Sequence, residues 1–245
     1  MESSIKITAM TTGGEKLNRV KNALKAAIKP GVSALEIEKL AQDLIAVEGA
    51  QASFKMVPGY KWATCINVNE GLVHGIPKKE IIFEKGDVVS VDIGIYYKGY
   101  HTDTAFTVGL EVDEKTKRFL EIGEKALREA VEGAKVGNRI YDISEVIQTV
   151  VEKGGFYPIR SFVGHTVGKK LHEQPQIPCF VQGERAKSPE IKEGMTLAVE
   201  VMYAQGDPNV VRDPDGWTIY MANGKISALF EDTVAVVKNG PKVLT

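Results

Sequence analysis

Residues 88–108 read VVSVDIGIYYKGYHTDTAFTV, and this stretch decides the fold. The odd-numbered positions from 89 to 93 are apolar, which is the period-two pattern of a half-buried strand. The pair Lys98-Gly99 then separates this run from a second strand-like run, and such a pair suits a two-residue turn. The stretch therefore predicts a β-hairpin with strands over 88–97 and 100–108.

This predicted hairpin brings two aspartates onto one face. Its two-residue loop places Asp92 opposite Ala105, and Asp103 lies two residues along on the same face, within reach as a diagonal neighbour. A one-residue bulge would change the pairing. Two like charges so placed repel, so either one carries a proton or a cation lies between them. A solvated polar face is the alternative, but the small, apolar Ala105 on that face favours a functional role such as metal binding.

The rest of the chain predicts helices followed by strands, twice over. Helices are expected from after Thr12-Gly13-Gly14 to Lys29-Pro30-Gly31, from a capping box at 33–36 to about Glu48, over 114–132 and over 140–153. Further strands are expected over 53–56, 63–68, 159–162, 196–203, 217–221 and 229–237.

The two halves of the chain resemble each other. Aligning Gly31 with Gly137 also aligns Gly49 with Gly155, which indicates an internal duplication. Any two amphipathic helices can align as well by chance, so both interpretations stay open. We expect a single catalytic domain over 1–245, with a short strand or tail at 1–10 and repeated halves at about 12–110 and 111–240.

The composition is that of an ordinary soluble globular chain. It has 245 residues, is 43% hydrophobic and carries 31 basic against 32 acidic side chains. No long run of one charge sign occurs, so nothing points to nucleic acid or an anionic membrane as a partner. No apolar run reaches the ~20 residues that span a bilayer, and no secretory leader is evident. Cys65 and Cys179 lack CxxC spacing, which favours a reducing cytoplasm.

Three further chelating side chains lie in apolar or glycine-flanked segments, namely His165, Glu200 and Glu231. A buried carboxylate is costly unless a cation or hydrogen bonds compensate it. Together with Asp92 and Asp103 they form a donor set for hard or borderline divalent ions, and four carboxylates neutralise two dications. Each alone has an ordinary alternative, a solvent-facing Glu or a hydrogen-bonded structural His. Their number favours a two-metal site.

The chain has three other histidines. His172 follows His165 by seven residues, and His74 lies in the glycine-flanked segment GLVHGIP. His101 is close to Asp103 in the chain but has the opposite strand parity, so we expect it to be structural or exposed. A lone histidine is more often a hydrogen-bonded structural residue than a ligand, so glycine-flanked histidines are by themselves a weak functional signal.

Taken together, several of these segments closely resemble the type I methionine aminopeptidases, and the resemblance runs in order over roughly residues 10–240. The segments are CINVNE (65–70) with HGIP (74–77), Asp92 with Asp103 eleven residues later, GH (164–165) with HEQP (172–175), GMT (194–196) leading to Glu200, and FEDT (230–233). The resemblance implies an α+β pita-bread fold, with two pseudo-symmetric αβ halves around a central antiparallel sheet.

The resemblance also implies how the metal ligands are shared. Asp92 should chelate one divalent ion, His165 and Glu200 the other, and Asp103 and Glu231 should bridge the two. Water activated by the two ions should attack the scissile carbonyl. Mn, Fe, Co and Zn all accept mixed oxygen and nitrogen ligands, so the native ion stays open.

Catalytic and substrate-binding roles follow from the same resemblance. Glu200 should shuttle the proton, His172 should stabilise the developing oxyanion, and His74 should contact the scissile amide or the leaving amine. Both histidines, with Tyr60, Cys65 and Trp217, should bind the substrate, the last three around the methionine side chain. Plain core packing is the alternative for Tyr60, Cys65 and Trp217.

The implied activity is removal of N-terminal methionine from nascent chains, near the ribosome, by a cytoplasmic monomer without a direct nucleic-acid or membrane partner. One alternative is an Xaa-Pro aminopeptidase or prolidase with the same ligands, which the segment 74–77 argues against. Another is a non-catalytic peptide- or ribosome-binding homologue, which the retention of all five ligands argues against. Several positions depart from the family's usual residues and leave pocket shape, metal preference and rate open: Phe54, Val57, Thr166, Leu171 and Leu229.

Overall fold

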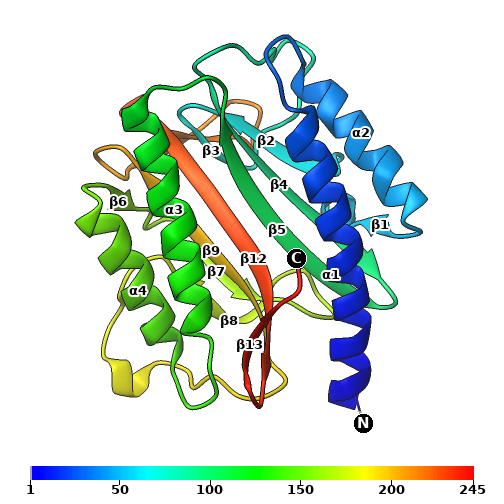
Figure 1. The fold of residues 1–245 in the computed structure, drawn as a ribbon, viewed down its shortest axis with the longest axis vertical. Coiled ribbons are helices and arrows are strands. Elements are labelled where there is room, and N and C mark those ends of the chain that lie inside the picture. The colour runs from blue at the N-terminus through cyan, green and yellow to red at the C-terminus, as the bar shows by residue number, and fades with distance from the viewer. Residues whose placement is uncertain (1) are drawn as a thin grey trace.

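In the computed structural model, which describes residues 2–245, four α-helices cover one face of an antiparallel sheet (Figure 1). They are α1 (Glu2–Ala27), α2 (Ala34–Val47), α3 (Glu114–Glu132) and α4 (Ile140–Lys153). One helix pair covers each half of the sheet. This arrangement follows the helix-helix-strands order that the sequence predicts for each half.

The main sheet has the strand order β1-β4-β5-β12-β9-β7-β8, with β2 beside β4, β6 beside β9 and β13 beside β12. Its strands are β1 (Gln51–Ala52), β2 (Thr64–Val68), β4 (Val88–Tyr97), β5 (Tyr100–Gly109), β6 (Tyr157–Pro158), β7 (Val163–Thr166), β8 (Glu173–Pro178), β9 (Thr196–Ala204), β12 (Ser227–Val237) and β13 (Gly240–Val243). A second sheet contains β3 (Gly71–Val73), β10 (Val210–Arg212) and β11 (Ile219–Met221). The predicted fold class, two αβ halves around a central antiparallel sheet, is confirmed.

The hairpin of β4 and β5 forms as its sequence predicts. Lys98 and Gly99 have φ angles of 48° and 89°, and positive φ at both central residues is what a type I′ turn requires. The register then pairs Asp92 with Ala105 and Gly94 with Asp103, without a bulge. Both aspartates therefore project from the same face of the sheet.

Corresponding positions in the two halves adopt the same local structure. Ser33 before α2 donates its backbone N–H to Glu36 at 2.9 Å, and Arg139 before α4 donates its own to Asp142 at 2.8 Å. Positive φ angles recur at the aligned glycines, with 90° and 88° at Gly31 and Gly137 and 66° and 86° at Gly49 and Gly155. The aligned segments therefore share their local structure, and the internal duplication stays a prediction.

Two predicted boundaries at the N-terminal end are wrong. Of the segment expected as a short strand or tail at 1–10, residues 2–10 belong to α1 and Met1 lies outside the described residues. The helix also runs through Gly13 and Gly14 instead of starting after them. The reason is a close contact from far along the chain, since a Cβ on Gly14 would lie 2.2 Å from the carbonyl oxygen of Leu244. Gly14 therefore lets α1 pack closely against the C-terminal segment. Local propensity alone predicts a helix break at this glycine.

Two predicted strands also differ from the structure. Residues 53–56 form a 3₁₀ turn, Phe54–Met56, because Phe54 turns inward to an apolar cluster with Tyr60. Residues 159–162 leave the sheet between β6 and β7. Both exceptions line the cavity described below.

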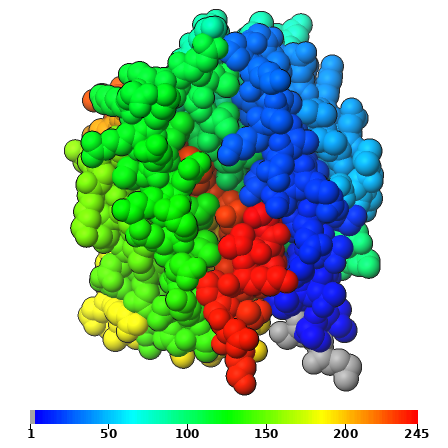
Figure 2. Space-filling model, in the orientation of Figure 1, coloured from blue at the N-terminus to red at the C-terminus, as the bar shows by residue number. Residues whose placement is uncertain are grey.

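The helices and the sheet are joined by two large apolar clusters. One packs Leu17 and Leu24 of α1 against Val91 and Phe106 of the hairpin. The other packs α3 against β9 and β12, and α4 against α3, β6 and β8. Between them, the C-terminal segment (red) fills the space between α1 (blue) and α3 (green) on the helix face (Figure 2). Burying one large aliphatic side chain contributes about 1.5–3 kcal/mol, so the sheet is a firm platform for side chains on its other face.

Candidate metal centre

Five neighbouring strands each contribute one of the predicted chelating side chains. In the sheet order β4-β5-β12-β9-β7, the residues are Asp92, Asp103, Glu231, Glu200 and His165. The intervening Asp232 faces α1 instead, where Lys21 lies 3.1 Å from its carboxylate. Because side chains alternate across a strand, the five chelating residues project from the opposite face.

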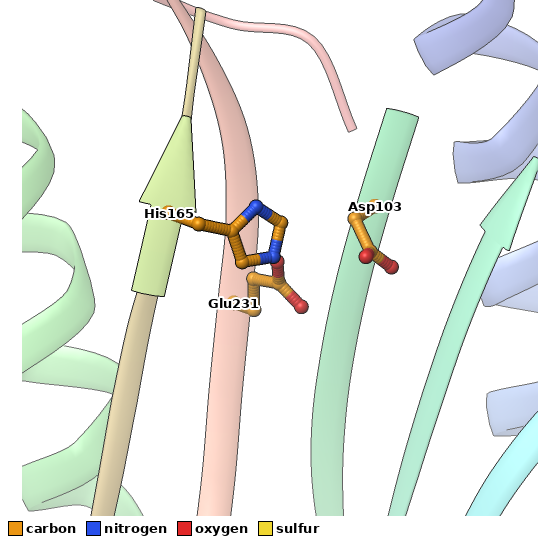
Figure 3. Close-up of side chains that lie close together, drawn as sticks. All are labelled: Asp103, His165 and Glu231. Carbon is orange, nitrogen blue, oxygen red and sulfur yellow. The ribbon is translucent and has the colours of Figure 1, made fainter. Parts of the chain in front are cut away.

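The side chains converge on one space. The ligand atoms of Asp103, His165 and Glu231 all lie within 4.8 Å of one another, and Figure 3 shows the three groups approaching from β5, β7 and β12. Glu200 joins them, with its Oε1 3.5 Å from Nε2 of His165. Asp92, on β4, lines the same cavity of about 330 Å³. The structure thus brings together all five side chains that the sequence assigns to metals.

The electrostatics of this cluster demand a compensating charge. Burial raises the pKa values of Asp92, Glu200 and Glu231 well above normal, and the charge of Asp103 adds to each shift. Burial likewise raises the pKa of Asp103 to about 7. Within residues 2–245, the cavity lining includes no lysine or arginine. Only protons or bound cations are therefore left to neutralise the four carboxylates.

The donor atoms fit divalent cations. Oδ1 of Asp92 and Oε1 of Glu231 are buried and accept no hydrogen bond within the described chain. Such oxygens are costly to bury unless another group satisfies them. Burial lowers the pKa of His165 to about 4, which keeps its imidazole neutral and able to coordinate. Carboxylate oxygens with one neutral imidazole suit ions such as Mn²⁺, Fe²⁺, Co²⁺ and Zn²⁺.

Two further histidines flank the carboxylates. The rings of His172 and His165 are 4.5 Å apart between centroids at an interplanar angle of 82°. His74 has a φ of 58°, an uncommon conformation for a residue other than glycine. Burial lowers the pKa of His172, and burial with the nearby His172 and Arg212 lowers that of His74 to about 4. Both rings are therefore neutral near pH 7.

The remaining predicted site residues form an apolar wall of the same cavity. The rings of Tyr60 and Trp217 meet edge to face, 5.0 Å apart between centroids, and Cys65 lies beside them. Asp215 fixes the Trp217 loop by accepting hydrogen bonds from the backbone N–H groups of Trp217 and Thr218. Tyr60, Cys65 and Trp217 do pack in a small cluster, but that cluster faces the cavity.

The sequence did not single out every residue of the wall. Phe162, in a segment predicted as a strand, sets its ring edge to face against His74, 5.6 Å apart between centroids. Phe54, Val57 and Leu171, noted only as departures from a pattern, complete the apolar lining. By contrast His101 lies outside the cavity lining and bonds through Nδ1 to Ser53 Oγ at 2.9 Å, so its expected structural role fits.

The sheet geometry and the acid-rich cavity define a metal-dependent peptidase, and the chain belongs to metallopeptidase family M24, which residues 8–238 match. The chain is 38% identical to the methionine aminopeptidase of Clostridium perfringens, over 100% of this chain and 98% of that one. The structure of the methionine aminopeptidase from Thermotoga maritima superposes with a TM-score of 0.94 and 39% identity, covering 98% of this chain and 96% of that one. The predicted membership of the methionine aminopeptidases is confirmed.

Prolidases share the fold at greater distance. The prolidase from Pyrococcus furiosus superposes with a TM-score of 0.76 and 26% identity, covering 98% of this chain but 63% of that one. Its additional length has no counterpart in residues 1–245. Among the helices of residues 2–245, none is both long and apolar enough to cross a membrane.

Proposed function

We propose that this protein is an aminopeptidase that removes the N-terminal methionine from peptides and nascent proteins. One observation carries the proposal: five chelating side chains and an apolar wall share one cavity of about 330 Å³. Such a cavity has a place for a cleavable bond at the charged end and for an aliphatic side chain at the other. Relatives named methionine aminopeptidase that match the whole chain support this substrate.

We propose further that the cavity holds two divalent ions. Asp92 would bind one ion, His165 and Glu200 the other, and Asp103 and Glu231 would lie between them. The four buried carboxylates support this number, because two dications neutralise four negative charges. When bound, the ions supply Lewis acidity toward the scissile carbonyl and a water of lowered pKa.

The protein's own groups then handle protons and developing charge. Glu200 takes a proton from the attacking water and passes it to the leaving amine, a role suited to a carboxylate of raised pKa. His172, neutral because of burial, donates an N–H to the oxygen of the scissile carbonyl as negative charge develops. His74 contacts the scissile amide or the leaving amine.

Specificity follows from the two ends of the cavity. A substrate's free amino group lies beside Asp92, so chains without a free N-terminus at that position are excluded. The methionine side chain lies among Tyr60, Cys65 and Trp217, where aromatic edges and a thiol contact its polarizable sulfur. A branched or charged side chain fits this wall less well.

Hydrolysis assays with added Mn²⁺ or Co²⁺ test the proposal. We expect release of methionine from Met-Ala-Ser and no cleavage of an Ala-Pro peptide. Cleavage of the proline peptide alone would assign the protein to the prolidase activity instead. The Asp92→Asn variant is the matched inactive control, since it keeps the shape of the side chain and removes its charge.

We also propose that the enzyme works as a cytoplasmic monomer on chains emerging from ribosomes, without a nucleic-acid or membrane partner of its own. The near-neutral charge of the chain supports the last point. Size-exclusion chromatography and co-sedimentation with ribosomes displaying a Met-initiated chain test the state and the setting. A stable dimer in the chromatography would contradict this proposal. So would co-sedimentation of the protein with free RNA to the same extent as with the ribosomes.

A further inference from the structure

The two strands that carry Asp103 and Glu231 have an unusually short backbone ladder between them. β5 and β12 lie side by side at the centre of the sheet (Figure 1), yet their register comprises only Glu231 with Ala105 and Asp232 with Thr104. In contrast, the register of β12 with β9 runs from Ser227 to Ala235. Something other than backbone pairing must hold the central strands together beyond these two pairs.

Beside Asp103, a threonine hydroxyl takes over that task. The backbone N–H of Asp103 donates to Oγ1 of Thr233 at 2.9 Å, and the same hydroxyl donates to the backbone carbonyl of Asp103 at 2.8 Å. The backbone groups of Thr233 are engaged elsewhere, its N–H with Oγ1 of Thr245 at 2.9 Å and its carbonyl with the N–H of Leu244 at 2.9 Å. The hydroxyl of Thr233 therefore stands in for the backbone partner that Asp103 would have in a regular ladder.

The same bridge recurs with the strands exchanged. Oγ1 of Thr107 on β5 donates to the backbone carbonyl of Leu229 on β12 at 2.7 Å and accepts from its N–H at 3.1 Å. Thr107 is buried, as is Thr233. The two bridges flank the pair Glu231 and Ala105 symmetrically, but only the Thr233 bridge holds a chelating residue directly.

We propose that Thr233 is a positioning residue for the metal centre: its hydroxyl fixes the backbone of Asp103 and so sets the separation of Asp103 and Glu231. The inference rests on the proposed function, because it assigns those two carboxylates to shared ions. The Asp103 side chain adds little freedom of its own, since its Oδ1 accepts the N–H of Thr104 at 3.1 Å. Moving the backbone of Asp103 therefore moves its carboxylate.

Matched substitutions separate positioning from stability. Thr233→Val keeps the volume and removes the hydroxyl, and Thr107→Val does the same at the mirror-related bridge. Co²⁺ binding is followed by its visible absorption, and thermal unfolding is measured in chelator. We expect both variants to lose similar thermal stability, whereas Thr233→Val alone binds Co²⁺ about tenfold more weakly. Thr233→Ser, which keeps the hydroxyl, restores the affinity, and at saturating Co²⁺ Thr233→Val lowers kcat more than it changes KM.

The outcomes are distinct. Equal Co²⁺ affinities for Thr233→Val and Thr107→Val would overturn the inference and leave the proposed function standing. Absence of Co²⁺ binding by the unsubstituted protein would overturn the metal centre and the inference with it. If Thr233→Val does not fold, Thr245→Val serves instead, because Oγ1 of Thr245 accepts from Thr233 and lies 3.4 Å from the carbonyl oxygen of Asp103. It should weaken Co²⁺ binding, and unchanged affinity there would refute the bridge.

Discussion

Replacing a metal ligand should stabilise this protein when metal is absent. In Asp103→Asn the shape of the side chain is kept, and Oδ1 of the amide still accepts the N–H of Thr104, but the charge is removed. The native Asp103 lies in a buried cluster with Asp92, Glu200 and Glu231, whose pKa values its charge raises. Removing one charge relieves this repulsion in the metal-free protein.

The pKa of Asp103 sets the sign and size of the effect. Its folded-state pKa of about 7 lies above its normal value of 3.8, so its contribution to stability is full below about pH 4 and is lost as pH rises to about 7. A shift of about three units at 1.4 kcal/mol each gives about 4 kcal/mol as an upper bound. Since the four carboxylates share the titration, we expect about 2–4 kcal/mol of relative stabilisation at pH 8.

Thermal and urea unfolding in chelator at pH 5 and pH 8 measure this effect. Asp103→Asn should unfold at higher temperature than the native protein at pH 8, with a smaller difference at pH 5. Each kcal/mol corresponds to about 2–4 °C for a chain of this size. Excess Co²⁺ should reverse the order, because only the native protein keeps the full ligand set. Asp43→Asn, on the exposed face of α2, is the control. An Asp103→Asn variant less stable than the native protein at pH 8 without metal would refute the reasoning.

Three further substitutions probe separate parts of the site. His172→Ala should fold and bind Co²⁺ like the native protein but lose about 10²–10³-fold in kcat, the cost of a missing oxyanion donor; loss of metal binding would assign His172 a structural role. Asp215→Ala removes the acceptor of the Trp217 and Thr218 N–H groups. It should raise KM for Met-Ala-Ser and lower the free energy of unfolding by about 2–3 kcal/mol. An unchanged KM would contradict the assigned pocket. Gly164→Ala places a Cβ 2.6 Å from the carbonyl oxygen of Ala198, so it should lower the free energy of unfolding by about 1–3 kcal/mol and displace His165. Gly168→Ala is the control, because its Cβ meets only the flexible side chain of Glu173. Equal metal affinities for the two glycine variants would exclude the displacement.

Much of the site could be predicted because its signals are local. Each chelating residue sits in an apolar strand segment, and the turn at Lys98-Gly99 determines which residues of the hairpin share a face. The order of strands in the sheet is not local, and no spacing in the chain reveals that β12 lies between β5 and β9. The family resemblance implied only that the five residues share one metal site, and the structure supplies the strand order that brings them into one cavity.

The incorrect predictions share one cause, which is contact with distant parts of the chain. Local sequence predicts a helix break at Gly14, but in the fold the C-terminal segment packs against this residue. Local sequence predicts Phe162 as the end of a strand, but in the fold its ring contacts His74 in the cavity lining. The bridging role of Thr233 is equally hidden, because a threonine in a strand gives no sign that its hydroxyl replaces a backbone partner.

The number and position of bound ions test the account most directly. Crystals grown with Mn²⁺ and measured for anomalous scattering should show two peaks in the cavity, with Asp103 and Glu231 in contact with both. The Asp92 carboxylate should touch one ion, and His165 with Glu200 the other. A single peak, or two peaks away from these five side chains, would contradict the proposed dinuclear centre.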